Sequence, residues 1–479
     1  MTRYLIGIDN GSQSSKVTIF DEHGAVVSTG RCALRPSDMP APGVVEHPDD
    51  DLWTSIGAAA REALAGFDGD PRDIVGVGLC TIRFCRAMLR ADGSLAQPVL
   101  SWMDARVAQP FRAERDDVAW VTTSSGYITH RLTGEFRDTA ANYQGMWPID
   151  TGTWRWLADD DDLAEFGIAR SQLFDLVDPG DVLGTITAEA ARHTGLPEGL
   201  PVVATANDKA VEALGCGLAG ADTVLVSLGT YIAGMTVGTH DARDASAFWS
   251  NFASIPGRYL YESGGIRRGM WTISWFRDLL GEAESEAARA SGSSLEDVLG
   301  AEAALVPAGS DGLVAVLDWL APAEAPYRRG SLLGFDGRHG RAHVYRALLE
   351  GIALTMHERT TALSGELGVA FERVVLSGGG SQSNLMMQIV ADVFGVPAAR
   401  NAVSDGAGLG AAICAAVGLG VHPGFEEAQV AMVAERDVFR PDAARHAFYG
   451  RLQTVYRDVT GHTDEVYRRL AAVPGVAGV

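Results

Sequence analysis

Short apolar runs that end in acidic or glycine-rich turns recur along the chain. RYLIGID (3–9), KVTIF (16–20), DIVGVGLCT (73–81) and PVVATAND (201–208) are such runs. Runs of this length, bounded by turn residues, predict strands. The segment TVLVSLGTYIAGMTVG (223–238) predicts a strand, a turn and a second strand.

Longer segments with helical spacing lie between these runs. In LWTSIGAAAREAL (52–64) apolar residues recur every three or four positions, and three aspartates precede it, which suits a helix N-terminus. RVVLSGGGSQSNLMMQIVADVFG (373–395) reads as a strand, a triple-glycine turn and an amphipathic helix. Strands that alternate with helices predict the α/β class.

Two segments more than two hundred residues apart resemble each other. Residues 8–12 (IDNGS) and 226–230 (VSLGT) each pair the end of a strand with a glycine and a hydroxyl, and a second apolar run follows each. This favours a duplicated α/β unit, although a strand followed by Gly-Ser/Thr is common in α/β proteins. A chain of 479 residues is longer than a single hydrophobic core usually supports. We therefore expect two domains, at 1–219 and 220–479.

The charge and cysteine content exclude several classes of protein. A net charge of −22 repels phosphodiester backbones, so we expect no nucleic-acid partner. Five scattered cysteines do not form a disulfide framework and suit a reducing compartment. No apolar run approaches the roughly 20 residues of a membrane span. These features predict a cytoplasmic protein without a membrane partner.

Three glycine turns at strand ends predict phosphate binding. Backbone N–H groups can approach phosphate oxygens where no Cβ intervenes, as at Gly11-Ser12, Gly229-Thr230 and Gly378-Gly379-Gly380. The first turn differs from a Walker P-loop, because an acid, Asp9, comes before it and Lys16 comes last. A carboxylate there can hold Mg²⁺ that bridges to phosphates, and Lys16 can neutralise a phosphate oxygen. Asp9 could also be a turn-forming residue only.

Asp208 is a second acid at a strand end, in ATANDKAVEALGCG. It could cap the helix that follows it. It could equally be a general base that takes the proton of an attacking hydroxyl. The residues around it leave both interpretations open.

At this point the motifs resemble those of a known family, the FGGY carbohydrate kinases, which include glycerol kinase, xylulokinase and ribulokinase. The segments GIDNGSQSSKVTIFDEHG, ANDKAVEALGCG, SLGTY, RALLEGIA and LSGGGSQSNLMMQIVADVFGVP occur in the family's order over essentially the whole chain. The resemblance implies two actin-like, ribonuclease-H-like ATPase domains that flank a cleft. It also implies ATP and Mg²⁺ as cofactors and a small sugar or polyol as substrate, with a pentulose favoured. A homodimer is an expectation at the level of the family.

The resemblance also assigns roles to single residues. It implies that Asp208 is the catalytic base and that Asp9 lies near Mg²⁺. The positions that it implies for the nucleotide are Gly11, Ser12, Lys16, Gly229, Thr230, Gly269, Gly379 and Ser383. The positions that it implies for the sugar are Arg83, Phe84, Trp102, Asp104 and Asp208.

The sugar half of the chain departs from the family pattern. Glycerol kinases carry Arg-Glu and xylulokinases carry Met-His where this chain has Arg83-Phe84. The stretch between residues 106 and 126 is also short, and the missing residues usually help to wall the sugar site. The identity of the sugar therefore stays open. Two alternatives to a kinase also stay open, an actin-like ATP-binding switch and a non-catalytic sugar sensor.

Overall fold

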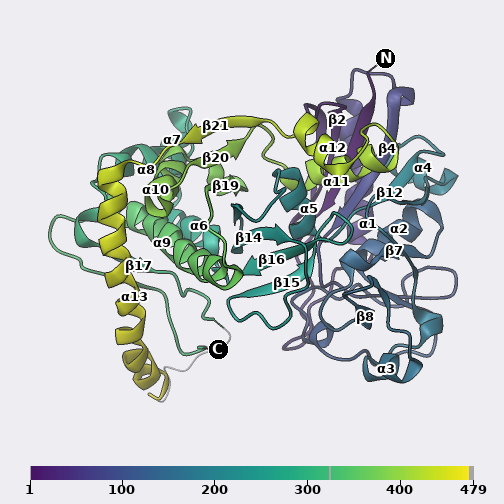
Figure 1. The fold of residues 1–479 in the computed structure, drawn as a ribbon, viewed down its shortest axis with the longest axis horizontal. Coiled ribbons are helices and arrows are strands. Elements are labelled where there is room, and N and C mark those ends of the chain that lie inside the picture. Colours follow the sequence, from purple (N-terminus) through teal and green to yellow (C-terminus); the bar gives the residue numbers. More distant parts are fainter. Residues whose placement is uncertain (1, 323–324, 474–479) are drawn as a thin grey trace.

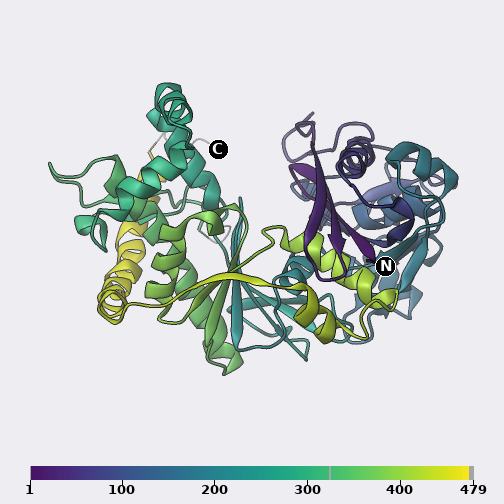
Figure 2. The ribbon, with the colours of Figure 1, turned by 90° about the horizontal axis from the view of Figure 1, so that it is seen from above.

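Two lobes, each built on a central sheet, make up the protein in the computed structural model, which describes residues 2–322 and 325–473 (Figures 1 and 2). The first sheet has six strands in the order β11-β12-β4-β1-β2-β3, and the second has seven in the order β15-β16-β14-β13-β19-β20-β21. The first sheet consists of β1 (Tyr4–Asn10), β2 (Ser14–Asp21), β3 (Val26–Ala33), β4 (Ile74–Thr81), β11 (Val182–Thr185) and β12 (Pro201–Ala204). The second consists of β13 (Thr223–Leu228), β14 (Ile232–Gly238), β15 (Phe248–Phe252), β16 (Tyr259–Ser263), β19 (Arg373–Ser377), β20 (Ala398–Asn401) and β21 (Glu435–Phe439).

The two sheets share one topology. In the first, β1 pairs antiparallel with β2 and parallel with β4; in the second, β13 pairs antiparallel with β14 and parallel with β19. Three antiparallel strands and two parallel ones thus run in the same spatial order, β3-β2-β1-β4-β12 and β16-β14-β13-β19-β20. This repeat supports the duplication inferred from residues 8–12 and 226–230, and the predicted α/β class is confirmed.

Helices cover both sheets. They are α1 (Asp51–Ala65), α2 (Ser124–Thr133), α3 (Asp160–Glu165), α4 (Ala188–Thr194), α5 (Asp208–Gly215), α6 (Gly269–Leu280), α7 (Glu282–Ala290), α8 (Leu295–Ala304), α9 (Arg341–Leu367), α10 (Asn384–Phe394), α11 (Gly406–Gly418), α12 (Phe425–Met432) and α13 (Ala443–Ala471). Short strands form small two-stranded sheets: β5 (Ala87–Leu89) with β6 (Trp120–Thr122), β7 (Arg137–Thr139) with β10 (Asp175–Val177), β8 (Ile149–Asp150) with β9 (Arg155–Trp156), and β17 (Val314–Val316) with β18 (Ser331–Leu333). Within the described ranges, no helix is long and apolar enough to cross a membrane.

A late segment of the chain returns to the first lobe. Helices α11 and α12 lie beside β2 and β4 (Figure 1), although they follow β20 of the second sheet. Leu5 of β1 and Ile413 of α11 share one apolar cluster. A Cβ on Gly7 would lie 1.9 Å from the carbonyl oxygen of Gly408, so the helix backbone contacts the strand directly. The division at residue 219 stays a prediction, and residues 406–432 pack on the sheet of the first part.

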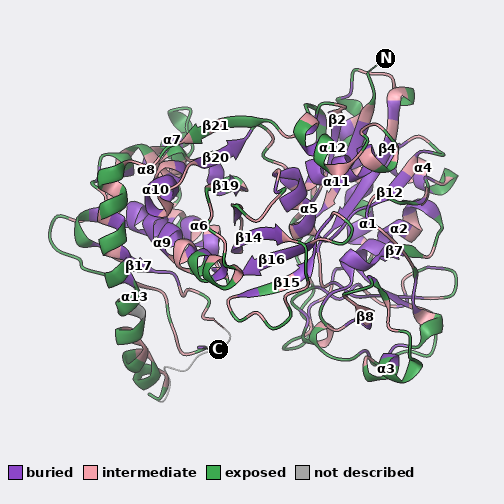
Figure 3. Cartoon of the chain, viewed as in Figure 1, coloured by how far each residue is buried: buried purple, intermediate pink, exposed green. Residues whose placement is uncertain are grey.

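The cores of both lobes are apolar and lie around the two sheets (Figure 3). The strands β1, β4, β13 and β19 are almost wholly buried, and the ends of β1 and β13 and the turn after β19 line one pocket. Chain segments that leave these strand ends therefore gather at one place. Residues from both lobes can meet there.

Candidate active site

A pocket of about 650 Å³ lies where the glycine turns of the two sheets face each other. It is lined by the end of β1, the turns after β13 and β19, and α6. Its lining residues include Asp9, Gln13, Ser14, Lys16, Arg31, Gly229, Thr230, Gly378, Gly379, Gly380 and Ser404. A second cavity of about 680 Å³ shares Gly379 and Gly380 with the first and extends between α8, α9 and α10.

Six of the eight predicted nucleotide positions border or adjoin this space. Lys16, Gly229, Thr230 and Gly379 line the first pocket, and Ser383 lines the second. Gly269 begins α6 just before the lining residue Met270, and its N–H donates to the Thr230 carbonyl over 2.7 Å. Gly11 and Ser12 lie in the turn between β1 and β2; the pocket is lined instead by the next residues of that turn, Gln13 and Ser14.

The Gly378 turn is shaped by its backbone. Gly378 has a φ of 77°, and a Cβ on it would lie 2.6 Å from the Leu228 carbonyl oxygen. A left-handed residue in such close contact has to be glycine. Across the pocket, the Gln13 amide donates to the Thr230 hydroxyl over 3.3 Å. The glycine turns of the two sheets are thus within reach of one ligand.

An acidic cluster borders this pocket. Burial, together with the charge of Asp405, raises the pKa of Asp9 to about 7, and Lys16 opposes the shift. The Lys16 ammonium lies 3.5 Å from an Asp405 carboxylate oxygen, and Thr18 donates to the same oxygen over 3.2 Å. Asp405 also caps α11, because its side chain accepts from the Gly408 N–H. The sequence analysis missed Asp405, whose only local signal is an acid before the glycine-rich start of a helix.

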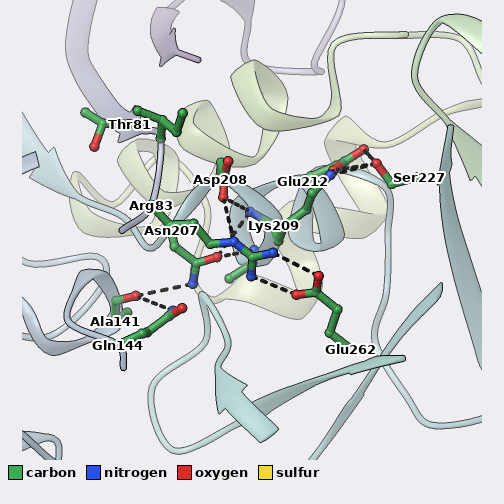
Figure 4. Close-up of polar contacts among 12 residues, drawn as sticks. Thr81, Arg83, Ala141, Gln144, Asn207, Asp208, Lys209, Glu212, Ser227 and Glu262 are labelled. Carbon is green, nitrogen blue, oxygen red and sulfur yellow. Dashed lines mark hydrogen bonds and ion pairs between the residues drawn. The ribbon is translucent and has the colours of Figure 1, made fainter. Parts of the chain in front are cut away.

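Asp208, at the first position of α5 (Figure 4), lies close enough to this cluster for its charge to act on Asp9. The helix cap is its neighbour Asn207, whose side chain accepts from the N–H groups of Lys209 and Ala210. Asp208 accepts one backbone bond, from Lys209, and its side chain keeps 28% of its surface exposed. Burial raises its pKa, while Arg83 and Lys209 lower it. Asn207, and not Asp208, therefore caps this helix.

Arg83 connects Asp208 to the second lobe. Its Nε lies 3.7 Å from an Asp208 oxygen, and its two terminal nitrogens donate to the two oxygens of Glu262 over 2.7 and 2.8 Å (Figure 4). The guanidinium lies 5.1 Å from the Phe84 ring centre and 5.5 Å from that of Trp249. Phe84 has a φ of 64°, which is unusual for a non-glycine residue. The structure therefore brings the predicted Arg83, Phe84 and Asp208 together, and adds Glu262 and Trp249.

A second polar network joins α5 to the second sheet. The Lys209 ammonium contacts Glu212 over 2.9 Å and the Ser227 hydroxyl over 2.8 Å. Glu212 also accepts from Ser227 and, over 2.6 Å, from Ser377. Burial alone would lower the pKa of Lys209, but Glu212 and Asp208 outweigh it and raise that pKa. Spacing along the sequence gives no sign of this network, because its members come from three elements.

The two other predicted sugar positions have different surroundings. The buried Asp104 carboxylate accepts from the Val45 N–H over 2.8 Å and from three nitrogens of Arg106. It thereby caps the short turn Ala105–Ala108. Trp102 is 47% exposed. The geometry joins neither residue to Asp208 by a contact, and their sugar-binding role stays a prediction.

The fold is that of a two-domain sugar kinase. Sequence models described as "FGGY family of carbohydrate kinases" match the chain, the N-terminal domain at residues 4–115 and 110–215 and the C-terminal domain at 224–419. The chain belongs to the FGGY family of carbohydrate kinases. These enzymes are phosphotransferases that act on sugar hydroxyls, with ATP as the phosphate donor. The predicted family, fold class and enzyme class are confirmed.

Individual relatives agree with this assignment. The chain is 48% identical to a protein described as "Uncharacterized sugar kinase YgcE" of Escherichia coli (strain K12), over 468 residues that cover 98% of this chain and 95% of the relative. It is 25% identical to the xylulose kinase of Bacillus subtilis (strain 168), over 97% of this chain and 98% of the relative. The crystal structure of xylulose kinase from Rhodospirillum rubrum superimposes with a TM-score of 0.81 at 26% identity, and covers 97% of this chain and 100% of that one.

Proposed function

We propose that the protein transfers the γ-phosphoryl group of ATP to a hydroxyl of a small sugar or polyol, with a pentulose as the favoured substrate. The relatives named xylulose kinase support the pentulose. The observation that carries the proposal is the position of Asp208. Its carboxylate is partly exposed, its helix is capped by Asn207, and its charge acts on Asp9, which lines the glycine-lined pocket.

The chemistry follows from this arrangement. Asp208 accepts the proton of the substrate hydroxyl as the hydroxyl oxygen attacks the γ-phosphorus, and the bond from that phosphorus to the leaving ADP oxygen breaks. The raised pKa of Asp208 favours proton transfer to it. The turns at Gly229 and Gly379, together with Lys16, offer N–H groups and positive charge to the phosphates. Arg83 and Phe84 would hold the sugar against the base.

The acidic cluster fits Mg²⁺. Asp9 lines the phosphate pocket, and burial, together with repulsion from the neighbouring Asp405 carboxylate, raises its pKa. A divalent cation would relieve that repulsion and would neutralise phosphate charge when bound. The described residues contain no group of three or more His, Cys, Asp or Glu that could hold a metal by themselves. One or two carboxylates with substrate phosphates are the usual Mg²⁺ ligands.

An ATP-consumption screen over ketopentoses, aldoses and polyols tests the proposal. ADP release that depends on one of these acceptors, and that Asp208→Asn abolishes, supports it. ATP binding without acceptor-dependent ADP release would favour the alternatives, an actin-like switch or a sugar sensor. The cytoplasmic location, the homodimer and the lack of a nucleic-acid partner stay predictions.

A further inference from the structure

Among the residues that the structure describes, the two cations that act most strongly on Asp208 each have a carboxylate partner. Arg83 is bound through two nitrogens to Glu262, and Lys209 is bound to Glu212. These four residues are the charged groups that act most strongly on Asp208. The two ion pairs cancel in charge, so one net negative charge, that of Asp208, faces the acceptor.

The partner of Arg83 comes from the opposite lobe. Glu262 lies on β16 of the second sheet, directly opposite Trp249 of β15, so both side chains share one face of that sheet. Trp249 and Phe84 cover the guanidinium while Glu262 holds its edge. The Glu262 side chain is 5% exposed and that of Arg83 is 12% exposed. Residues of both lobes therefore hold Arg83 in a buried ion pair. The positive charge of Arg83 is neutralised by Glu262 before any acceptor binds.

We propose that Glu262 is a specificity-determining residue which, by neutralising Arg83, restricts the acceptor to uncharged sugars and polyols and excludes sugar acids. This inference rests on the proposed function. A carboxylate on the acceptor would meet Asp208 beside two cations, Arg83 and Lys209, that Glu262 and Glu212 already neutralise. Like charges at short range in a partly buried site repel strongly. An uncharged hydroxyl-bearing acceptor can bind to Asp208 and Arg83 without this repulsion.

The first test compares matched acceptors in the wild-type protein. Ribitol and ribonate, or xylitol and xylonate, differ only in whether C1 is a hydroxymethyl group or a carboxylate. Among the pairs of which either member is phosphorylated, we expect kcat/KM for the uncharged member to exceed that for the acid on the order of 100-fold. Ketopentoses in the same assay should resemble the uncharged members. Equal or faster turnover of the acids overturns the inference and leaves the kinase function intact.

The second test changes Glu262. Glu262→Gln keeps the size of the side chain but frees the charge of Arg83, so the preference for the uncharged member should fall at least ~10-fold, chiefly through a lower KM for the acid. A matched control is Glu426→Gln, which breaks another ion pair between the lobes, that of Arg258 with Glu426 of α12, on the surface. This control should leave the preference unchanged.

The outcomes separate the two proposals. A folded Glu262→Gln protein with an unchanged preference overturns the role of Glu262. If that variant does not fold, the wild-type comparison still decides whether the site rejects acids. Failure of every acceptor to stimulate ADP release would overturn the proposed function itself, and this inference with it.

Discussion

Replacing Asp208 by Asn removes the negative charge of the proposed base and keeps nearly the same shape. The helix that begins at this residue should not suffer, because its cap is Asn207. The single backbone bond that Asp208 accepts, from Lys209, can still form with an amide oxygen. The variant therefore separates the chemical role of the residue from its structural role.

The expected effect on turnover is large. Loss of a positioned general base typically costs about 10²–10⁴ in rate. This corresponds to roughly 2.7–5.5 kcal/mol in the activation barrier. The free energy of unfolding should change by less than about 1 kcal/mol, because the carboxylate is partly exposed and is not the cap. KM for ATP should stay within a few-fold.

A coupled assay of ADP release with the best acceptor from the screen measures this loss, and a denaturant titration measures stability. Asn207→Ala is the matched control, since it removes the cap and should cost roughly 0.5–2 kcal/mol of stability. If Asp208→Asn stays folded and turns over within a few-fold of wild type, the assignment of the base is wrong. The same conclusion follows if its main defect is a loss of stability like that of the control.

Four further predictions concern other parts of the structure. Burial and a neighbouring carboxylate raise the pKa of Asp9 to about 7. The contribution of protonated Asp9 to the free energy of unfolding is therefore fully present below about pH 4 and is lost as the pH rises through about 7. Asp9→Asn should therefore add roughly 1–2 kcal/mol to the free energy of unfolding at pH 8 and little at pH 4, as denaturation curves at both pH values would show. Gly378→Ala should cost roughly 1–3 kcal/mol in a denaturant titration, because it forces a Cβ onto a backbone carbonyl at positive φ. Gly379→Ala meets no other atom within 4 Å, so its melting temperature should hold while KM for ATP rises. Glu350→Ala leaves the buried Arg346 without its carboxylate and should cost roughly 3–5 kcal/mol by thermal or chemical unfolding; a loss below about 1 kcal/mol would contradict this.

Much of the fold could be predicted because its signals are local. A strand such as β1 is a short apolar run that ends at a turn, and Asp9 and the glycine after it are adjacent in the sequence. The same is true of the turn after β19, where Gly378 follows the strand directly. The duplication could also be recognised, since both copies keep the same order of a strand, a polar turn and a second strand. Each of these features depends on neighbours a few residues apart.

The rest of the site depends on contacts between distant residues. Glu262 follows Arg83 by 179 residues and meets it only because β16 faces the first lobe. Asp405 comes near Asp9 only through the return of α11 to the first sheet. The sequence also could not show whether Asp208 caps its helix. Asn and Asp are equally good caps, and only the backbone conformation decides that Asn207 takes this position. Side-chain partners, unlike strand ends, have no fixed spacing.

The return of α11 to the first sheet has a consequence for biosynthesis. As the nascent chain leaves the ribosome, Leu5, Phe20 and Val203 have no covering helix until about four hundred residues have been made. The first lobe therefore stays incomplete until every strand of the second sheet except β21 has been synthesised. A recombinant fragment that stops near residue 219 would expose this apolar face to water and invite aggregation, unless residues 406–432 were grafted back onto it.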